Sequence, residues 1–258
     1  MKTATEAPNQ SPNLDEKTWW DFWNKSYRTG DDNGEIPNEL FARAAKVVNE
    51  VASRGQRRIL EVACGTGAFS RLLTFSSYHG LDISPAAIEI ARQNSARVLR
   101  SVGDSLPTYE AADFHDWPFP SDPFDIAVCI DALVWFRDQR LALTRMAQCL
   151  RPGGQLVLVV INPFVYKRIK RTAGNPLKEG TISHWLSRNE LYALTKAAGF
   201  AIERSYTIMP RGNRGILRLL NARRVDEALG PHVAARFRRL KEHSGLGQYR
   251  VLIARKRR

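Results

Sequence analysis

The chain has 258 residues, of which 43% are hydrophobic, and this is enough to bury one sizeable core. It contains no run of 18 or more apolar residues, so no membrane-spanning helix is expected. The net charge of +13 is uneven, because residues 1–163 carry 17 Lys and Arg against 20 Asp and Glu, whereas residues 164–258 carry 22 against 6. This basic final third indicates either an anionic partner or a well-solvated surface.

The first 17 residues are polar and lack the apolar stretch of a secretory signal. We therefore expect a disordered lead-in and a cytoplasmic protein. The cysteines are Cys64, Cys129 and Cys149, each in an apolar context, and their spacing matches no zinc or redox pattern. Buried free thiols in a reducing compartment are the expectation, and no metal site is predicted.

Predicted strands and helices alternate along the chain. Short apolar runs predict strands at residues 57–63, 78–84, 108–114, 124–131, 155–161, 201–209 and 247–256. Helical periodicity predicts helices at residues 18–27, 38–52, 84–96, 139–150 and 187–200, a helix beginning or continuing at 70–75, and mostly helical, strongly basic sequence over 212–244. Asn38 and Ser84 are suitable N-caps, and Pro85 suits the first position of a helix.

This order of elements is typical of an α/β fold with a doubly wound sheet. A long segment joins the last two strands, in place of a crossover helix of the usual length. The final strand is therefore expected to run antiparallel to the others, beside the fifth strand. The sequence contains no internal repeat.

Two glycines follow the first predicted strand in the stretch EVACGTG, Glu61 to Gly67. In open α/β sheets ligands bind at the carboxyl ends of the strands, and glycine lets the backbone approach a ligand closely. Asp82 closes the second strand, where a carboxylate suits the two hydroxyl donors of a ribose. A dinucleotide site would need a third glycine where Ser70 stands, so a pyrophosphate ligand is disfavoured.

Four stretches follow one another along the chain: Glu61–Gly67, GLDIS at Gly80–Ser84, DFHDWPFPSDPFD at Asp113–Asp125, and LRPGGQLVLV at Leu150–Val159. Taken together and in this order, they resemble the motifs of class I S-adenosylmethionine-dependent methyltransferases of the small-molecule and quinone-type group. Trp117 departs mildly from this pattern, because the family often has Leu there. The resemblance implies a seven-stranded Rossmann-like sheet in the order 3-2-1-4-5-7-6 with strand 7 antiparallel.

The resemblance also implies S-adenosyl-L-methionine as cofactor and S-adenosyl-L-homocysteine as product. Asp82 would bind the ribose, Asp113 the adenine amino group, and Phe114 the adenine ring. Glu61 would fix the loop or receive the cofactor's ammonium, and Tyr27, in an N-terminal lid helix, would approach its carboxylate. The full set of cofactor-binding candidates is Tyr27, Glu61, Ala63, Cys64, Gly65, Gly67, Asp82, Ile83, Asp113 and Phe114.

Two residues are candidates for acting on the acceptor. Asp131 ends the fourth strand and would face the methyl group, where it would orient the acceptor or remove its proton; a helix cap is the alternative. His184 follows the fifth strand and is a second candidate base, with ordinary loop structure as its alternative. His115 is a weaker candidate and is expected to be a surface or hydrogen-bonded histidine.

These observations predict one domain at residues 18–258, with a helical lid at 18–52 and acceptor-side insertions at 162–186 and 212–244. We expect methyl transfer by in-line displacement to an oxygen or nitrogen of a small biosynthetic metabolite. In one form of this hypothesis the metabolite is anionic. Two alternatives use the basic final third: an RNA methyltransferase, or an enzyme for an acceptor tethered to a carrier protein or lipid. Against RNA, strand 4 ends in IDAL and lacks the Asn/Asp-Pro-Pro-aromatic motif of base-amino methylation.

Overall fold

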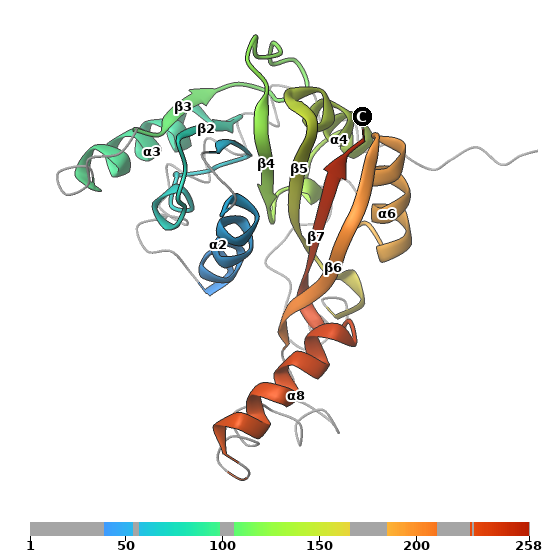
Figure 1. The fold of residues 1–258 in the computed structure, drawn as a ribbon. Coiled ribbons are helices and arrows are strands. Elements are labelled where there is room, and N and C mark those ends of the chain that lie inside the picture. Colours follow the sequence, from blue (N-terminus) through green and yellow to red (C-terminus); the bar gives the residue numbers. More distant parts are fainter. Residues whose placement is uncertain are drawn as a thin grey trace, which may run out of the picture.

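The computed structural model describes residues 39–53, 57–98, 106–165, 185–210, 228 and 230–257, and its strands form one mixed sheet. The strands are β1 Arg58–Val62, β2 Ser77–Asp82, β3 Thr108–Ala111, β4 Phe124–Ile130, β5 Leu150–Ile161, β6 Phe200–Pro210 and β7 Gly247–Lys256. The sheet order is β3-β2-β1-β4-β5-β7-β6, and β7 runs antiparallel to both of its neighbours. The predicted fold class, strand order and strand direction are confirmed (Figure 1).

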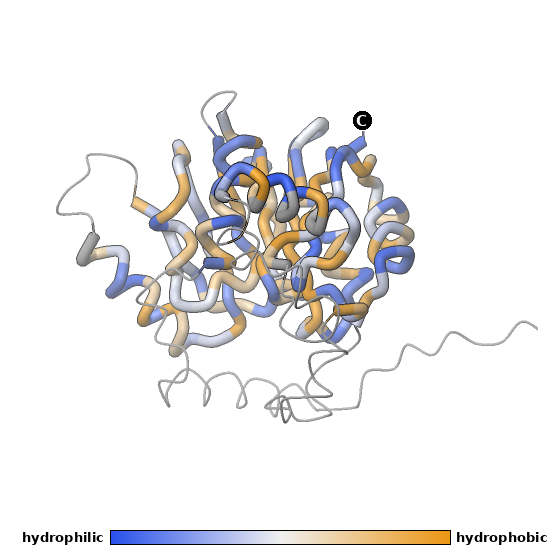
Figure 2. The backbone as a smooth tube through the Cα atoms, turned by 90° about the horizontal axis from the view of Figure 1, so that it is seen from below, coloured by the Kyte–Doolittle hydropathy of each residue, from blue (hydrophilic) through white to orange (hydrophobic). Residues whose placement is uncertain are grey.

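Helices cover both faces of this sheet. The α-helices are α2 Glu39–Ala52, α3 Pro85–Val98, α4 Gln139–Cys149, α6 Arg188–Ala197 and α8 Pro231–His243, and two 3-10 turns are η1 Ser70–Leu72 and η2 Leu133–Trp135. One buried cluster joins the sheet to α2 and α3, and a second joins its other face to α4 and α6. Hydrophobic and hydrophilic residues alternate along the helices, as expected for helices with one buried and one exposed face (Figure 2). No described helix is long and apolar enough to cross a bilayer.

The parallel strands are hydrophobic on both faces because helices cover both. All seven residues of β4 are buried, and its alternate side chains enter the two clusters. The predicted free thiols lie in these clusters: Cys64, Cys129 and Cys149 are buried and unbridged.

The last strand enters the sheet at the edge where the parallel strands end. Asn162, directly after β5, fixes this entry because its side-chain amide donates to the carbonyl oxygens of Gly245 and Gly247, both at 2.8 Å. Its backbone N–H also donates to the carbonyl of Gln248 at 2.7 Å. The segment that precedes β7 contains α8, which extends beyond this edge of the sheet (Figure 1).

Several boundaries differ from the prediction. The helix expected at 70–75 is only the 3-10 turn η1, because Asn49 of α2 bonds the carbonyl of Leu72 and the N–H of Thr74 and so diverts the chain toward β2. β3 ends three residues early. β5 begins five residues early, since Leu150 already pairs with Phe124 across a register shift. For the basic stretch 212–244, only α8 lies within the described residues.

Candidate active site

The loops after β1 and β2 are joined through Asp82, the last residue of β2. One carboxylate oxygen of Asp82 accepts the N–H of Gly65 at 2.8 Å, and the other accepts the N–H of Ser84 at 2.9 Å. Burial raises the pKa of Asp82 to about 6, although these two N–H groups oppose the shift. Each oxygen keeps a further lone pair, so Asp82 can still accept from a ligand hydroxyl.

The glycine loop has an unusual backbone. Gly65 and Gly67 have φ values of +53° and +71°, and Ala63 has +61°, a conformation that costs a non-glycine residue energy. A Cβ atom on Gly67 would lie 2.8 Å from the hydroxyl of Tyr109. Gly67 is therefore required by packing inside the protein as well as by any approach of a ligand. The Tyr109 hydroxyl also bonds Ser70, at the position of the missing third glycine, at 2.7 Å.

Glu61 is buried in β1, and its carboxyl group accepts a short hydrogen bond from the Tyr78 hydroxyl on β2. Burial raises the pKa of Glu61 to about 8; the bond from Tyr78 lowers it, and the nearby Asp82 raises it. No described cation forms an ion pair with Glu61. With a pKa of about 8, Glu61 is mostly protonated near pH 7, and a bound cationic group would favour its ionised form.

The stretch after β3 is fastened to α4. The carboxylate of Asp113 binds the backbone N–H and ring Nδ1 of His115, and its other oxygen binds Arg137 at 2.9 Å. Burial alone would raise the pKa of Asp113, but these partners lower it below its usual value. Phe114 is buried in the α4-side cluster, and its carbonyl accepts from Arg145. Both ring nitrogens of His115 are engaged, because Nε2 bonds the carbonyl of Asp138 at 3.0 Å.

Asp131 lies directly after β4, at the same edge as Asp82. It has a left-handed φ of +55°, and its N–H donates to the carbonyl of Val159 on β5 at 2.7 Å. The hydroxyl of Tyr249, on β7, donates to Oδ2 of Asp131 at 3.3 Å. The other oxygen, Oδ1, is buried and has no hydrogen-bond partner among the residues that the structure describes. Burial raises the pKa of Asp131 to about 7, against the effect of the Tyr249 bond.

The structure therefore brings most of the candidate residues to one edge of the sheet. The loop from Glu61 to Gly67 lies beside Asp82, which is followed by the half-buried Ile83. Tyr27 and His184 lie outside the described residues, so their roles stay predictions. The sequence analysis did not single out Tyr78, Tyr109 and Tyr249. The expected strand order places β7 beside β5, and it was the only indication that a residue near 249 would lie at this edge.

The comparison with protein families agrees with this geometry. The model of the methyltransferase domain family matches residues 37–205, which include β1 to β5 and the loops just described. The chain belongs to this family. The resemblance to class I S-adenosylmethionine-dependent methyltransferases is thereby confirmed.

Individual relatives are more distant. The chain is 32% identical over 145 residues to malonyl-[acyl-carrier protein] O-methyltransferase of Paenibacillus sp., covering 53% of this chain and 51% of that protein. It is 37% identical over 103 residues to O-methyltransferase cnsE of Penicillium expansum, covering 39% of this chain and 36% of that one. The chain thus spans about half or less of these two relatives.

A solved structure shows the same fold over nearly the whole chain. Magnesium protoporphyrin IX methyltransferase of Synechocystis PCC 6803, with bound S-adenosylhomocysteine, aligns with a TM-score of 0.61 at 16% identity. The alignment covers 93% of this chain and 98% of that protein. At this identity the likeness concerns the fold.

The described residues have donors and acceptors that suit S-adenosylmethionine. Asp82 offers acceptor lone pairs for ribose hydroxyls, and Glu61 offers a buried carboxyl group for an ammonium. Asp113 and Phe114 are committed to internal partners in this structure, so their contacts with an adenine stay predictions.

The buried carboxyl group of Glu61 predicts how stability depends on pH. Since its folded-state pKa of about 8 is above its usual value of 4.5, the folded protein holds a proton that the unfolded chain releases. The contribution of protonated Glu61 to the free energy of unfolding is then fully present below pH 4.5 and is lost as pH rises through about 8. Glu61→Gln should be near neutral at pH 5 and more stable than wild type at pH 9, by on the order of 1–3 kcal/mol. Chemical denaturation at both pH values measures this difference.

The control is Glu89→Gln, which changes an exposed carboxylate on α3. It should shift unfolding equally at both pH values. A Glu61→Gln variant with the same pH dependence as wild type would contradict the assignment of a neutral, buried Glu61.

Proposed function

We propose that this protein transfers the methyl group of S-adenosylmethionine to an oxygen or nitrogen of a small biosynthetic metabolite. The cofactor supplies a methyl group already activated on a sulfonium sulfur, so the protein's task is to position the acceptor and handle its proton. Family membership and the loops around Asp82 support this proposal. A cytoplasmic location stays part of the hypothesis.

The observation that carries the proposal is Asp131. A buried carboxylate oxygen that has no described partner, on a residue with a left-handed backbone at the carboxyl edge of the sheet, supports a functional role. Its pKa of about 7 suits a general base near neutral pH. In this proposal Oδ1 of Asp131 would receive the proton that the acceptor's hydroxyl or amine loses as its oxygen or nitrogen bonds the methyl carbon and the bond from that carbon to the sulfonium sulfur breaks.

Relatives named as O-methyltransferases favour oxygen as the acceptor atom. One of them is named for a substrate on an acyl-carrier protein, and α8 gives a second reason to consider a tethered acceptor. Its exposed arginines Arg236 and Arg239 lie beyond the sheet edge that also bears Asp131. Acidic carrier proteins are complementary in charge to such a helix.

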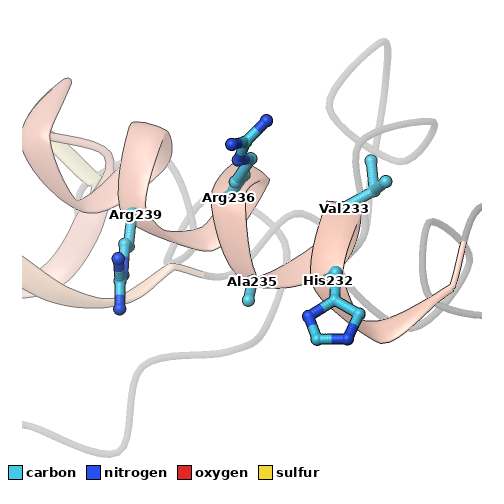
Figure 3. Close-up of a pocket in the computed structure, with 5 residues that line it drawn as sticks. All are labelled: His232, Val233, Ala235, Arg236 and Arg239. Atoms are coloured by element: carbon cyan, nitrogen blue, oxygen red, sulfur yellow. The ribbon is translucent and has the colours of Figure 1, made fainter.

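The side chains of α8 do not form a converging small-molecule site. His232, Val233, Ala235, Arg236 and Arg239 line a hollow of about 360 Å³. Figure 3 shows Arg236 and Val233 on one side of the helix and His232 and Arg239 on the other. The exposed positive charge of α8, and not this hollow, supports a carrier-tethered or lipid-tethered acceptor as the second candidate.

Cofactor binding should depend on Asp82. Asp82→Asn keeps a similar shape but replaces one acceptor oxygen with a donor, so affinity for S-adenosylhomocysteine should fall about ten-fold or more. Calorimetric titration measures the Kd, and thermal unfolding checks the loop, since both oxygens of Asp82 accept backbone N–H groups. Asp116→Asn, on an exposed side chain, is the control. Unchanged affinity in Asp82→Asn would remove the ribose assignment.

Catalysis should depend on Asp131 and on its bond from Tyr249. Asp131→Asn should lower kcat about 100-fold or more, with cofactor affinity nearly unchanged. In wild type, kcat should rise as pH passes about 7, because the base must be ionised. Tyr249→Phe removes a hydrogen bond that lowers the pKa of Asp131, so this rise should move to higher pH. A pH profile that stays in place in Tyr249→Phe would argue against Asp131 as the base.

Counting transferred label identifies the acceptor class. Purified protein, methyl-labelled S-adenosylmethionine and fractionated cell extract should give label in the organic-soluble pool. Label in a protein fraction that is lost in Arg236→Glu/Arg239→Glu, while a free acceptor is unaffected, would establish the carrier-tethered candidate. Label in RNA, abolished by nuclease and by salt, would overturn the small-molecule proposal.

A further inference from the structure

Ser70 stands where a dinucleotide site would have its third glycine, and its side chain is buried. Its hydroxyl donates to the carbonyl oxygen of Gly67 at 2.8 Å and also bonds the hydroxyl of Tyr109, on β3, at 2.7 Å. Ser95, on α3, donates to the same Tyr109 hydroxyl at 3.1 Å. Three buried hydroxyl groups therefore join α3 and β3 to the glycine loop.

The direction of each of these bonds follows from the number of protons. A hydroxyl group has one proton to donate, and a carbonyl oxygen has none. Because Ser70 donates to Gly67, Tyr109 must be the donor in its bond with Ser70, and Tyr109 accepts in turn from Ser95. The bonds thus form one directed chain that ends on the Gly67 carbonyl. Each bond in such a chain polarises the next one and strengthens it.

A second side chain ties α3 to the same loop. The amide of Asn94, next to Ser95, is buried and donates to the carbonyl of Thr66 at 3.2 Å. Two successive carbonyl groups of the loop, those of Thr66 and Gly67, therefore have side-chain donors. Burial raises the pKa of Tyr109 to about 12, although its bonds with the two serines oppose this shift. The Tyr109 hydroxyl thus keeps the proton that it donates throughout the neutral pH range.

The backbone of the glycine loop needs this support. Ala63, Gly65 and Gly67 have left-handed φ values, and a costly backbone conformation persists only where the surrounding structure fixes it. A loop that already has its binding shape does not have to be ordered by the ligand. The measured affinity falls in proportion to the fraction of molecules whose loop has that shape. Removing the support should therefore weaken ligand binding.

We propose that Tyr109 is a positioning residue for the cofactor, which acts through Ser70 to hold the glycine loop in the shape that receives the amino-acid end of S-adenosylmethionine. The resemblance assigns that end of the cofactor to this loop. The proposal rests on the cofactor of the proposed function, and not on its acceptor or on Asp131. It also explains why serine suits the third-glycine position, since a glycine there could neither accept from Tyr109 nor donate to Gly67.

The test compares two ligands on the whole protein. S-adenosylhomocysteine has the amino-acid end of the cofactor, whereas 5′-methylthioadenosine lacks it and keeps the nucleoside. Tyr109→Phe removes the hydroxyl and keeps the ring, so it should weaken S-adenosylhomocysteine about ten-fold and 5′-methylthioadenosine less than about two-fold. Calorimetric titration measures both Kd values. Ser70→Ala breaks the chain at its next link and should give the same pattern, whereas Ser95→Ala should have a smaller effect.

Thr108→Val is the matched control, because Thr108 precedes Tyr109 on β3. Its hydroxyl bonds the carbonyl of Tyr78 and the ring of His79, both on β2. The variant loses a hydrogen-bonded hydroxyl from the same strand, so it should lower the thermal midpoint. Its Kd for S-adenosylhomocysteine should stay within about two-fold of wild type.

Amide hydrogen exchange of the free protein separates a local effect from general loosening. In Tyr109→Phe the amides of residues 65–70 should exchange faster, while those of β4 stay protected. In Thr108→Val the loop amides should exchange as in wild type. Faster exchange throughout the sheet in Tyr109→Phe would instead indicate a purely structural residue.

Two binding results would overturn the proposal. One is an unchanged Kd for S-adenosylhomocysteine in both Tyr109→Phe and Ser70→Ala, and the other is an equal loss of affinity for the two ligands. Failure of the proposed function gives a different pattern, because the selective loss of S-adenosylhomocysteine would remain in a protein that transfers no methyl group. Where transfer is measured, Tyr109→Phe should raise KM for S-adenosylmethionine and leave kcat at saturation nearly unchanged.

Discussion

The burial of three carboxyl groups at the ends of adjacent strands is the constraint on which the site depends. Glu61, Asp82 and Asp131 belong to β1, to β2 and to the turn after β4, and burial raises the pKa of each. A different hydrogen-bond donor offsets part of this cost at each position. Glu61 accepts from a tyrosine hydroxyl on β2, Asp82 accepts from two backbone N–H groups, and Asp131 accepts from a tyrosine hydroxyl on β7. None of these partners is a cation. The proposed cofactor brings a sulfonium and an ammonium, so its binding would relieve the same cost.

The sequence predicted the part of this site that local spacing encodes. Gly65 follows β1 and Asp82 ends β2, and the parallel pairing of these two strands brings the residues together although they are 17 apart in sequence. Asp131 and Tyr249 are 118 residues apart in sequence, and β5 lies between the strands β4 and β7 to which they belong. No local sequence pattern therefore reveals their contact. Similarly, apolar periodicity suggested a helix at 70–75, whereas the side chain of Asn49, on another element, ends it after one turn.

A sequence motif identifies a residue at a position, but it does not show whether that residue contacts a ligand, other groups of the protein, or both. Asp113 and Phe114 were predicted from resemblance to contact an adenine, and the structure shows them fastening the loop after β3 to α4 through His115, Arg137 and Arg145. Gly67 likewise makes room for Tyr109. In each case packing inside the protein is sufficient to explain the residue type. Ligand contacts at these positions therefore need direct measurement.

The uneven charge of the chain matches the positions proposed for the cofactor and the acceptor along the sheet. Residues 1–163, which are slightly acidic, contribute β1 to β5 and all three buried carboxyl groups, on the side proposed for a cationic cofactor. Residues 164–258, which are strongly basic, contribute α6, α8 and β7, with the exposed Arg236 and Arg239 on α8. The acidic side would then attract the positively charged methyl donor, and the basic side would attract an acidic carrier of the acceptor, the second candidate proposed above. Once the methyl group leaves, the sulfonium charge is gone, and the attraction of the acidic side for the spent cofactor weakens.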